Sequence, residues 1–270
     1  MTTTHRIETA PGRFVGWESH GSGPGLAVLH GAARAGQHYR RLAHGLSDRF
    51  AVHLVDRNGR GLSLPRDDAP GLAGQVADVA AVFDATGAKF LFGHSAGGMV
   101  ALAAAPSVRP ERLVVYEPAV SIDHSIPSGQ ADDLRRELAG PDPARGMVHF
   151  AKDVGAVPAW APTGPTALFF RMFLSGPGGR ELSELVPLVL PDIEMIEADD
   201  GPASRFAAIT APALVMWGDR SPPFLVDAAR KVVAAIPNGK GLQLPGQRHD
   251  APDFFAAGLI ARHIAQFLGA

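Results

Sequence analysis

The stretch from 89 to 102 constrains the fold of this chain more than any other. It begins as a short apolar run with two aromatic residues, which is long enough for a buried strand. It then reads Gly-His-Ser-Ala-Gly at 93–97 and passes into an Ala-rich segment, 99–105, with strong helix propensity. A Gly-x-Ser-x-Gly turn between strand and helix strains the serine backbone and projects its hydroxyl above the sheet edge. The stretch therefore predicts a nucleophilic Ser95, with N–H groups of the following helix facing whatever the serine attacks.

Apolar runs and helical segments alternate along much of the remaining chain. Two short alternating runs, 5–9 and 13–19, predict an opening hairpin. Strands that alternate with helices at this spacing predict a parallel sheet with right-handed crossovers. The expected strands after the hairpin are 26–30, 51–56, 89–92, 112–118, 213–218 and 241–244, and the expected helices are 37–46, 72–86, 99–105, 224–236 and 252–268.

The alternation stops between residues 119 and 205, where helical pieces separated by Pro and Gly carry bulky apolar side chains. We interpret this segment as a helical cap that folds over the carboxyl ends of the strands, so that the core comprises 1–118 and 206–270. Part of its aromatic stripe is expected to face the cleft beneath it. The candidate pocket residues are Trp160, Phe169, Phe170 and Phe173 from the cap, with His30 and His94 from the core.

Composition excludes several classes of partner. Hydrophobic residues make up 46% of the chain and charged residues 19%, which is typical of a globular enzyme with a substantial core. The net charge is −2 and no more than two basic residues are adjacent, so binding to nucleic acid or to an anionic membrane is not indicated. The absence of cysteine excludes disulfides and thiolate metal sites. There is no apolar signal core and no run of membrane-spanning length, so we expect a cytoplasmic protein.

Six ordered landmarks together resemble the α/β-hydrolase superfamily over nearly the whole chain. The resemblance implies a mostly parallel eight-stranded sheet flanked by helices, a helical cap inserted after the sixth strand, and a Ser-His-acid triad. The landmarks are His30-Gly31, Asp56-Arg57 with Gly59-x-Gly61-x-Ser63, Gly93-His-Ser95-Ala-Gly97, Tyr116-Glu117-Pro118, Trp217-Gly218-Asp219 and Pro245-Gly246-x-x-His249.

The base and the oxyanion hole can be assigned within this resemblance. A serine hydroxyl is almost never ionised at neutral pH and needs a base. His249 lies between the last strand and the last helix, and the chain order serine, acid, histidine matches the fold. One oxyanion donor is expected from the amide of Ala96 and the other from Ala32, with Ala33 as the alternative. We expect His30 to support its loop and His94 to pack beneath the turn.

The acid departs from the common pattern. The family often carries an aspartate three residues after the glycine that closes the seventh strand, and Ser221 occupies that position here. Two carboxylates could substitute for it. Glu117 closes the neighbouring sixth strand, and Asp219 lies two residues before the usual position. We prefer Glu117, because its longer side chain could reach the histidine.

The resulting hypothesis is a hydrolase that cleaves an ester, thioester or lactone of a medium-sized apolar or aromatic small molecule through an acyl-enzyme. It needs no cofactor and no metal, and it acts as a monomer or homodimer. Ser95 argues against epoxide hydrolases and haloalkane dehalogenases, whose nucleophile is a carboxylate. Carbon–carbon bond hydrolases, lyases or cyclases, and ligand-binding pseudo-hydrolases of the same fold remain as alternatives, the latter two favoured by the missing acid at Ser221.

Overall fold

Eight strands form a single sheet in the structure, a computed structural model that describes residues 2–63, 71–126, 128–140, 142–176 and 179–269. The strand order is β1-β2-β4-β3-β5-β6-β7-β8. β1 and β2 pair antiparallel, as does β2 with β4, and every other pair is parallel. The strands are β1 (Thr2–Ala10), β2 (Arg13–His20), β3 (Gly25–Leu29), β4 (Ala51–Asp56), β5 (Phe90–His94), β6 (Arg112–Tyr116), β7 (Ala213–Gly218) and β8 (Gly239–Leu244).

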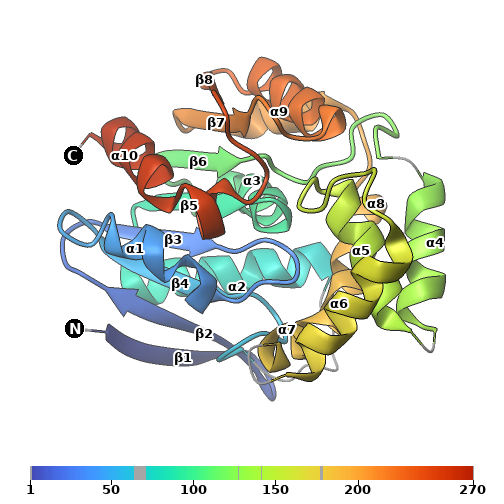
Figure 1. Ribbon diagram of the computed structural model, residues 1–270. Coiled ribbons are helices and arrows are strands. Elements are labelled where there is room, and N and C mark those ends of the chain that lie inside the picture. The colour runs from blue at the N-terminus through green and yellow to red at the C-terminus, as the bar shows by residue number, and fades with distance from the viewer. Residues whose placement is uncertain (1, 64–70, 127, 141, 177–178, 270) are drawn as a thin grey trace.

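Helices cover both faces of the sheet, as the near-continuous burial of the central strands requires. Successive strand residues point to opposite faces, so Leu91 joins one core cluster and Phe92 the other. α2 (Gly71–Thr86), α3 (Ala96–Val108) and α9 (Pro223–Ala235) pack in the first cluster, and α1 (Arg40–His44) and α10 (Ala257–Leu268) in the second. Figure 1 shows α1 and α10 on the near face and α2 and α3 behind the strands. This architecture confirms the predicted fold class.

Between β6 and β7 the chain forms helices that lie together at one end of the sheet, at the right of Figure 1. They form a small apolar cluster that includes Met147, Val186 and Val189, and Ala33 of the loop after β3 also belongs to it. The boundary between core and cap, at 118/119 and 205/206, stays a prediction. The helices are α4 (Ser128–Leu138), α5 (Pro143–Asp153), α6 (Thr163–Ser175), α7 (Arg180–Leu185) and α8 (Val189–Ala198), and the short helical turns of the chain are η1 (Gly36–Tyr39), η2 (Val186–Leu188), η3 (Ala203–Ala208) and η4 (Ala251–Phe255).

A buried charge cluster attaches these helices to the sheet. Arg57 and Arg60, which follow β4, both donate to the carboxylate of Asp192 on α8 at 2.7 to 2.9 Å. All three side chains are at most 3% exposed. Burial opposes the charge on Asp192, but the two guanidinium groups outweigh it and lower the pKa of Asp192 below its usual value. Burial lowers the pKa of Arg60 to about 10, which leaves it charged at neutral pH.

Within the described ranges, no helix is both long and apolar enough to cross a membrane. The same residues contain no cluster of three or more His, Asp or Glu side chains suited to holding a metal ion.

Candidate active site

Ser95 occupies a strained turn between β5 and α3. Its backbone has φ +54° and ψ −122°, a conformation that side-chain-bearing residues rarely adopt. The glycines on either side make the turn possible: a Cβ on Gly93 would collide with the backbone of the next turn, and one on Gly97 with the carbonyl oxygen of His30. α3 begins at Ala96, and the first N–H groups of a helix have no intrahelical acceptor.

A hydrogen-bond chain joins Ser95 to His249 and Glu117. The Ser95 hydroxyl lies 3.0 Å from His249 Nε2, and His249 Nδ1 lies 2.7 Å from Glu117 Oε2. Glu117 is fully buried, and its second oxygen accepts hydrogen bonds from the Gly218 N–H, at 2.7 Å, and from the Ser221 hydroxyl. Burial alone would raise the pKa of Glu117, but the bonds from His249 and these two donors lower it below its usual value.

Asp219, the other carboxylate considered as the acid, makes a different contact. Its Oδ1 accepts a hydrogen bond from the Gly246 N–H at 2.7 Å, which closes the turn after β8. In the part of the chain that the structure describes, no hydrogen bond or ion pair joins Asp219 to His249. Ser221, which occupies the usual position of the acid, instead donates a hydrogen bond to Glu117. The Glu117 carboxylate at the end of β6 is therefore held by a residue that follows β7.

His94 lies beneath the turn, as expected, and also reaches the cavity. Its Nε2 donates to the backbone carbonyl of His249 at 2.8 Å, and its Nδ1 accepts from the Tyr39 hydroxyl. The same hydroxyl accepts a bond from the Gly31 N–H at 3.1 Å. Burial lowers the pKa of His94 to about 3, so the ring is neutral and keeps these two roles. Sequence reasoning did not identify Tyr39, whose only signal was an aromatic residue in the helical segment after His30-Gly31.

The predicted oxyanion loop follows β3 and faces Ser95. Ala32 and Ala33 line the cavity beside Ser95, and Ala33 has a positive φ of 53°. Among the described residues, no hydrogen bond occupies the N–H of either alanine. His30 supports this loop from below: its Nδ1 donates to the Gly31 carbonyl at 2.8 Å, and its Nε2 accepts from the Arg57 N–H. Its ring is fully buried and lines no cavity at Ser95, so its assignment to the pocket was wrong.

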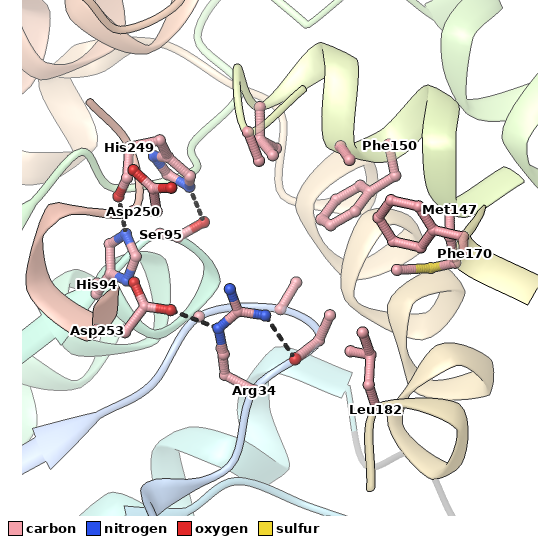
Figure 2. A pocket seen from close by; sticks show the side chains of 16 residues that line it. Arg34, His94, Ser95, Met147, Phe150, Phe170, Leu182, His249, Asp250 and Asp253 are labelled. Atoms are coloured by element: carbon pink, nitrogen blue, oxygen red, sulfur yellow. Dashed lines mark hydrogen bonds and ion pairs between the residues drawn. The ribbon is translucent and has the colours of Figure 1, made fainter. Parts of the chain in front are cut away.

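Ser95 lies between two cavities, and His249 lines both. The larger measures about 170 Å³ and the smaller about 90 Å³. In Figure 2, the larger cavity has Ser95 and His249 on one side and cap side chains on the other. Its cap wall consists mainly of Met147, Phe150, Phe170 and Leu182. The smaller cavity is mostly apolar, with Ala119, Ile126, Leu134, Ile193, Ile196 and Leu225 in its lining.

Of the four cap aromatics predicted for the pocket, only Phe170 lines it. Trp160, Phe169 and Phe173 are 84%, 66% and 44% exposed, so their assignment was wrong. For Phe169 and Phe173 the reason is helical phase: on α6, Ala167 and Phe170 share the inward face, while Phe169 and Phe173 share the outward one. Trp160 lies in a turn before α6. Sequence reasoning also missed Arg34, Asp250 and Asp253, three charged residues that line the larger cavity.

Comparison with known proteins is consistent with this geometry. The model of a family described as "Alpha/beta hydrolase family" matches residues 26–260. An alpha/beta hydrolase from Sphaerobacter thermophilus is 28% identical, with a TM-score of 0.78 over 98% of this chain and 100% of that one. An esterase from Rhodococcus sp. ECU1013, 18% identical, has a TM-score of 0.72 over 99% of this chain and 98% of that one, and shows the fold alone.

A pimeloyl-[acyl-carrier protein] methyl ester esterase from Chromobacterium violaceum is 38% identical over 120 residues. The match covers 42% of this chain and 45% of that protein. The chain thus spans about half the length of the curated relatives it matches.

Proposed function

Because this chain belongs to the alpha/beta hydrolase family, we propose that it hydrolyses a carboxylic ester, thioester or lactone through an acyl-enzyme on Ser95. The observation that carries the proposal is the chain from Ser95 through His249 to Glu117 at the junction of two cavities. Ester hydrolysis is also the activity in the names of the curated relatives.

In the first half of the reaction, the Ser95 oxygen attacks the carbonyl carbon while His249 Nε2 takes the hydroxyl proton. The carbonyl electrons move to its oxygen, which the N–H groups of Ala96 and Ala32, or alternatively Ala33, stabilise. The tetrahedral intermediate then expels the alcohol or thiol, which takes the proton from His249. Glu117 remains ionised and holds the His249 Nδ1–H, which stabilises the imidazolium while it exists.

In the second half, water replaces the alcohol. His249 takes a proton from the water as its oxygen attacks the acyl carbon, and the second tetrahedral intermediate releases the Ser95 oxygen, which recovers the proton. The products are the acid and the regenerated enzyme, and no step needs a cofactor or metal. We also propose that the protein is cytoplasmic and acts as a monomer or homodimer.

The cavities favour a small substrate with a medium-sized apolar or aromatic part. Pockets for drug-sized ligands measure roughly 300–1,000 Å³, and each cavity beside Ser95 is smaller than that. Their walls include Phe150 and Phe170 on one side and Ile193 and Ile196 on the other. We propose that residues 119–205 act as the cap that supplies these walls, with 1–118 and 206–270 as the catalytic core.

The proposal is tested with p-nitrophenyl acetate, butyrate and hexanoate and with a fluorophosphonate probe. The wild-type protein should release p-nitrophenol and become labelled at Ser95, located by mass spectrometry of the digest. Ser95→Ala should lose both properties. Full turnover by Ser95→Ala would contradict the acyl-enzyme.

The same variants separate the alternatives. A lyase or cyclase would keep its activity in Ser95→Ala and lose it in His249→Ala. A carbon–carbon bond hydrolase would cleave a 1,3-dicarbonyl compound and no simple ester, and a binding protein would be stabilised by ligand without turnover. The lyase and binding alternatives were favoured because Ser221 occupies the usual position of the acid. The contact of Glu117 with His249 supplies a carboxylate from another strand, so Ser221 no longer favours them.

A further inference from the structure

Three charged side chains line the larger cavity opposite its apolar cap wall. Arg34 follows the predicted oxyanion loop, Asp250 follows His249, and Asp253 lies in η4. Figure 2 shows the Arg34 guanidinium near the middle of the cavity, between Asp253 and Leu182. The acyl transfer described above uses none of the three.

Arg34 is fixed in place with one donor nitrogen unused. Its Nε donates to Asp253 Oδ2, and its Nη1 donates to the Ala33 carbonyl at 3.1 Å. Burial opposes the charge of the guanidinium, but Asp253 outweighs it and raises the pKa of Arg34. Among the described residues, Nη2 has no hydrogen-bond partner, and in Figure 2 this nitrogen lies on the side of Ser95. The cluster therefore offers a positioned donor to the cavity.

The two carboxylates place negative charge beside Arg34. The Asp253 side chain is 3% exposed, and its Oδ1 is buried without a hydrogen-bond partner in the described part of the chain. The same holds for the Oδ1 atom of Asp250. Both residues line the cavity, but neither of these oxygens has surface open to it. The carboxylates therefore contribute charge to the subsite, and Arg34 Nη2 contributes its directed contact.

We propose that Arg34, Asp250 and Asp253 form a subsite for a neutral substrate group that accepts a hydrogen bond, of the carboxamide or hydroxyl class. The group accepts from Arg34 Nη2, and the two carboxylates disfavour an anion there. The inference rests on the proposed ester hydrolysis and narrows its substrate to an ester with a polar group beside the apolar part.

Charge and hydrogen bonding exclude the other groups. The formal charges of Arg34, Asp250 and Asp253 sum to −1, so a carboxylate is repelled. An ammonium would place a cation against the Arg34 donor. An alkyl group leaves the Arg34 Nη2 donor unpaired, and sites built for a polar group reject analogues that lack it.

The test compares sets of esters that differ only in the group at one end of the chain, which is a methyl, carboxamide, carboxylate or ammonium group. One series varies the acyl chain of p-nitrophenyl esters from four to seven atoms, and the other varies the alcohol of butyrate esters. In one of the two series, the carboxamide should exceed the methyl compound by about tenfold or more in kcat/KM, and the carboxylate should be the poorest. A carboxylate or ammonium optimum, or equal rates for methyl and carboxamide in both series, overturns the subsite.

Arg34→Lys tests the assignment of the donor. Lysine keeps the charge beside Asp253 but cannot hold Asp253 and Ala33 while presenting a second directed donor. The preference for carboxamide over methyl should fall to about twofold or less, a ratio that is independent of enzyme concentration. The matched control is Arg40→Lys, an exposed ion-paired arginine that lines neither cavity and should keep the wild-type preference. An unchanged preference in Arg34→Lys contradicts the assignment.

Binding to Ser95→Ala separates failure of the subsite from failure of the proposed function. Calorimetric titration with the uncleaved carboxamide and methyl esters needs no turnover. Tighter binding of the carboxamide by about tenfold supports the subsite even if no ester is hydrolysed. Equal affinity overturns it even if wild-type esterase activity is high.

Discussion

The imidazole of His94 donates a hydrogen bond from Nε2 to the backbone carbonyl of His249, at 2.8 Å. The residue before the predicted nucleophile thus fixes the main chain of the predicted base. Tyr39 extends this contact, because its hydroxyl donates to His94 and accepts from the Gly31 N–H at the start of the predicted oxyanion loop. One buried chain of hydrogen bonds sets three segments of the candidate site relative to one another.

Replacing Tyr39 by phenylalanine tests this chain. The change leaves His94 Nδ1 and the Gly31 N–H without their partner, at a cost in stability of about 1–3 kcal/mol. Because the hydroxyl positions catalytic segments and does not contact substrate, we expect kcat to fall by about 10- to 100-fold, with KM nearly unchanged. Steady-state kinetics with p-nitrophenyl butyrate provide the measurement. Ser107→Ala, which deletes a hydroxyl bonded only within α3, is the control; a rise in KM with kcat unchanged would contradict a positioning role.

The acid is tested by Glu117→Gln against Asp219→Asn. All three groups around the Glu117 carboxylate are donors, so the NH₂ of a glutamine must face one of them. We expect kcat to fall by about 10³- to 10⁴-fold, the size of loss found when a triad aspartate becomes asparagine. Asp219→Asn should stay within about threefold in kcat. Equal losses in the two variants would remove Glu117 from its proposed role.

The cap attachment predicts a pH-dependent loss of stability. Asp192→Asn leaves two buried guanidinium groups without their carboxylate, which should cost about 3–5 kcal/mol. The pKa of Asp192 is lower in the folded than in the unfolded protein, so its contribution is complete above about pH 4 and is lost as the pH falls through the folded value. Urea unfolding from pH 3 to 8 should show a constant difference from wild type above pH 5 that shrinks below pH 4. A difference that grows on acidification would contradict this reading.

The two faces of α6 predict different effects from neighbouring phenylalanines. Phe170→Ala removes part of the cavity wall and should raise KM for an apolar ester such as the hexanoate by about tenfold, the equivalent of about 1.4 kcal/mol of lost contact. Phe169→Ala changes an exposed side chain and should stay within about twofold. Steady-state kinetics with the acetate and hexanoate esters separately measure KM for each. An equal loss of hexanoate preference in both variants would contradict the assigned helical phase.

The strand–turn–helix unit and the sheet were predictable because they depend on local patterns. Gly93 and Gly97 flank the serine within five residues, and the apolar strands are separated by clear turn signals. The carboxylate partner of His249 was harder to predict. Glu117 and Asp219 both follow strands at the same sheet edge, and only three-dimensional direction distinguishes the carboxylate that turns toward the imidazole from the one that closes a loop.

The cap was the least predictable part. α6 carries Leu168, Phe169, Phe170, Met172 and Phe173 almost consecutively, so no polar face fixes which side turns inward. The Arg57–Asp192 contact joins residues 135 positions apart, a pairing that no local pattern indicates. Arg34 is likewise held by Asp253, which lies 219 positions away in the sequence, so no local pattern indicates its place in the cavity.

The end of β6 has a consequence for exchanging the helices that follow it. Glu117, with its positive φ of 43°, is two residues from Ala119, whose N–H donates to the carbonyl oxygen of Ser95 at 3.0 Å. A backbone hydrogen bond therefore joins the exit toward α4 to the peptide of the nucleophile. A chimera that imports foreign helices in place of α4–α8 keeps its proton-transfer geometry only if the graft begins beyond Ala119.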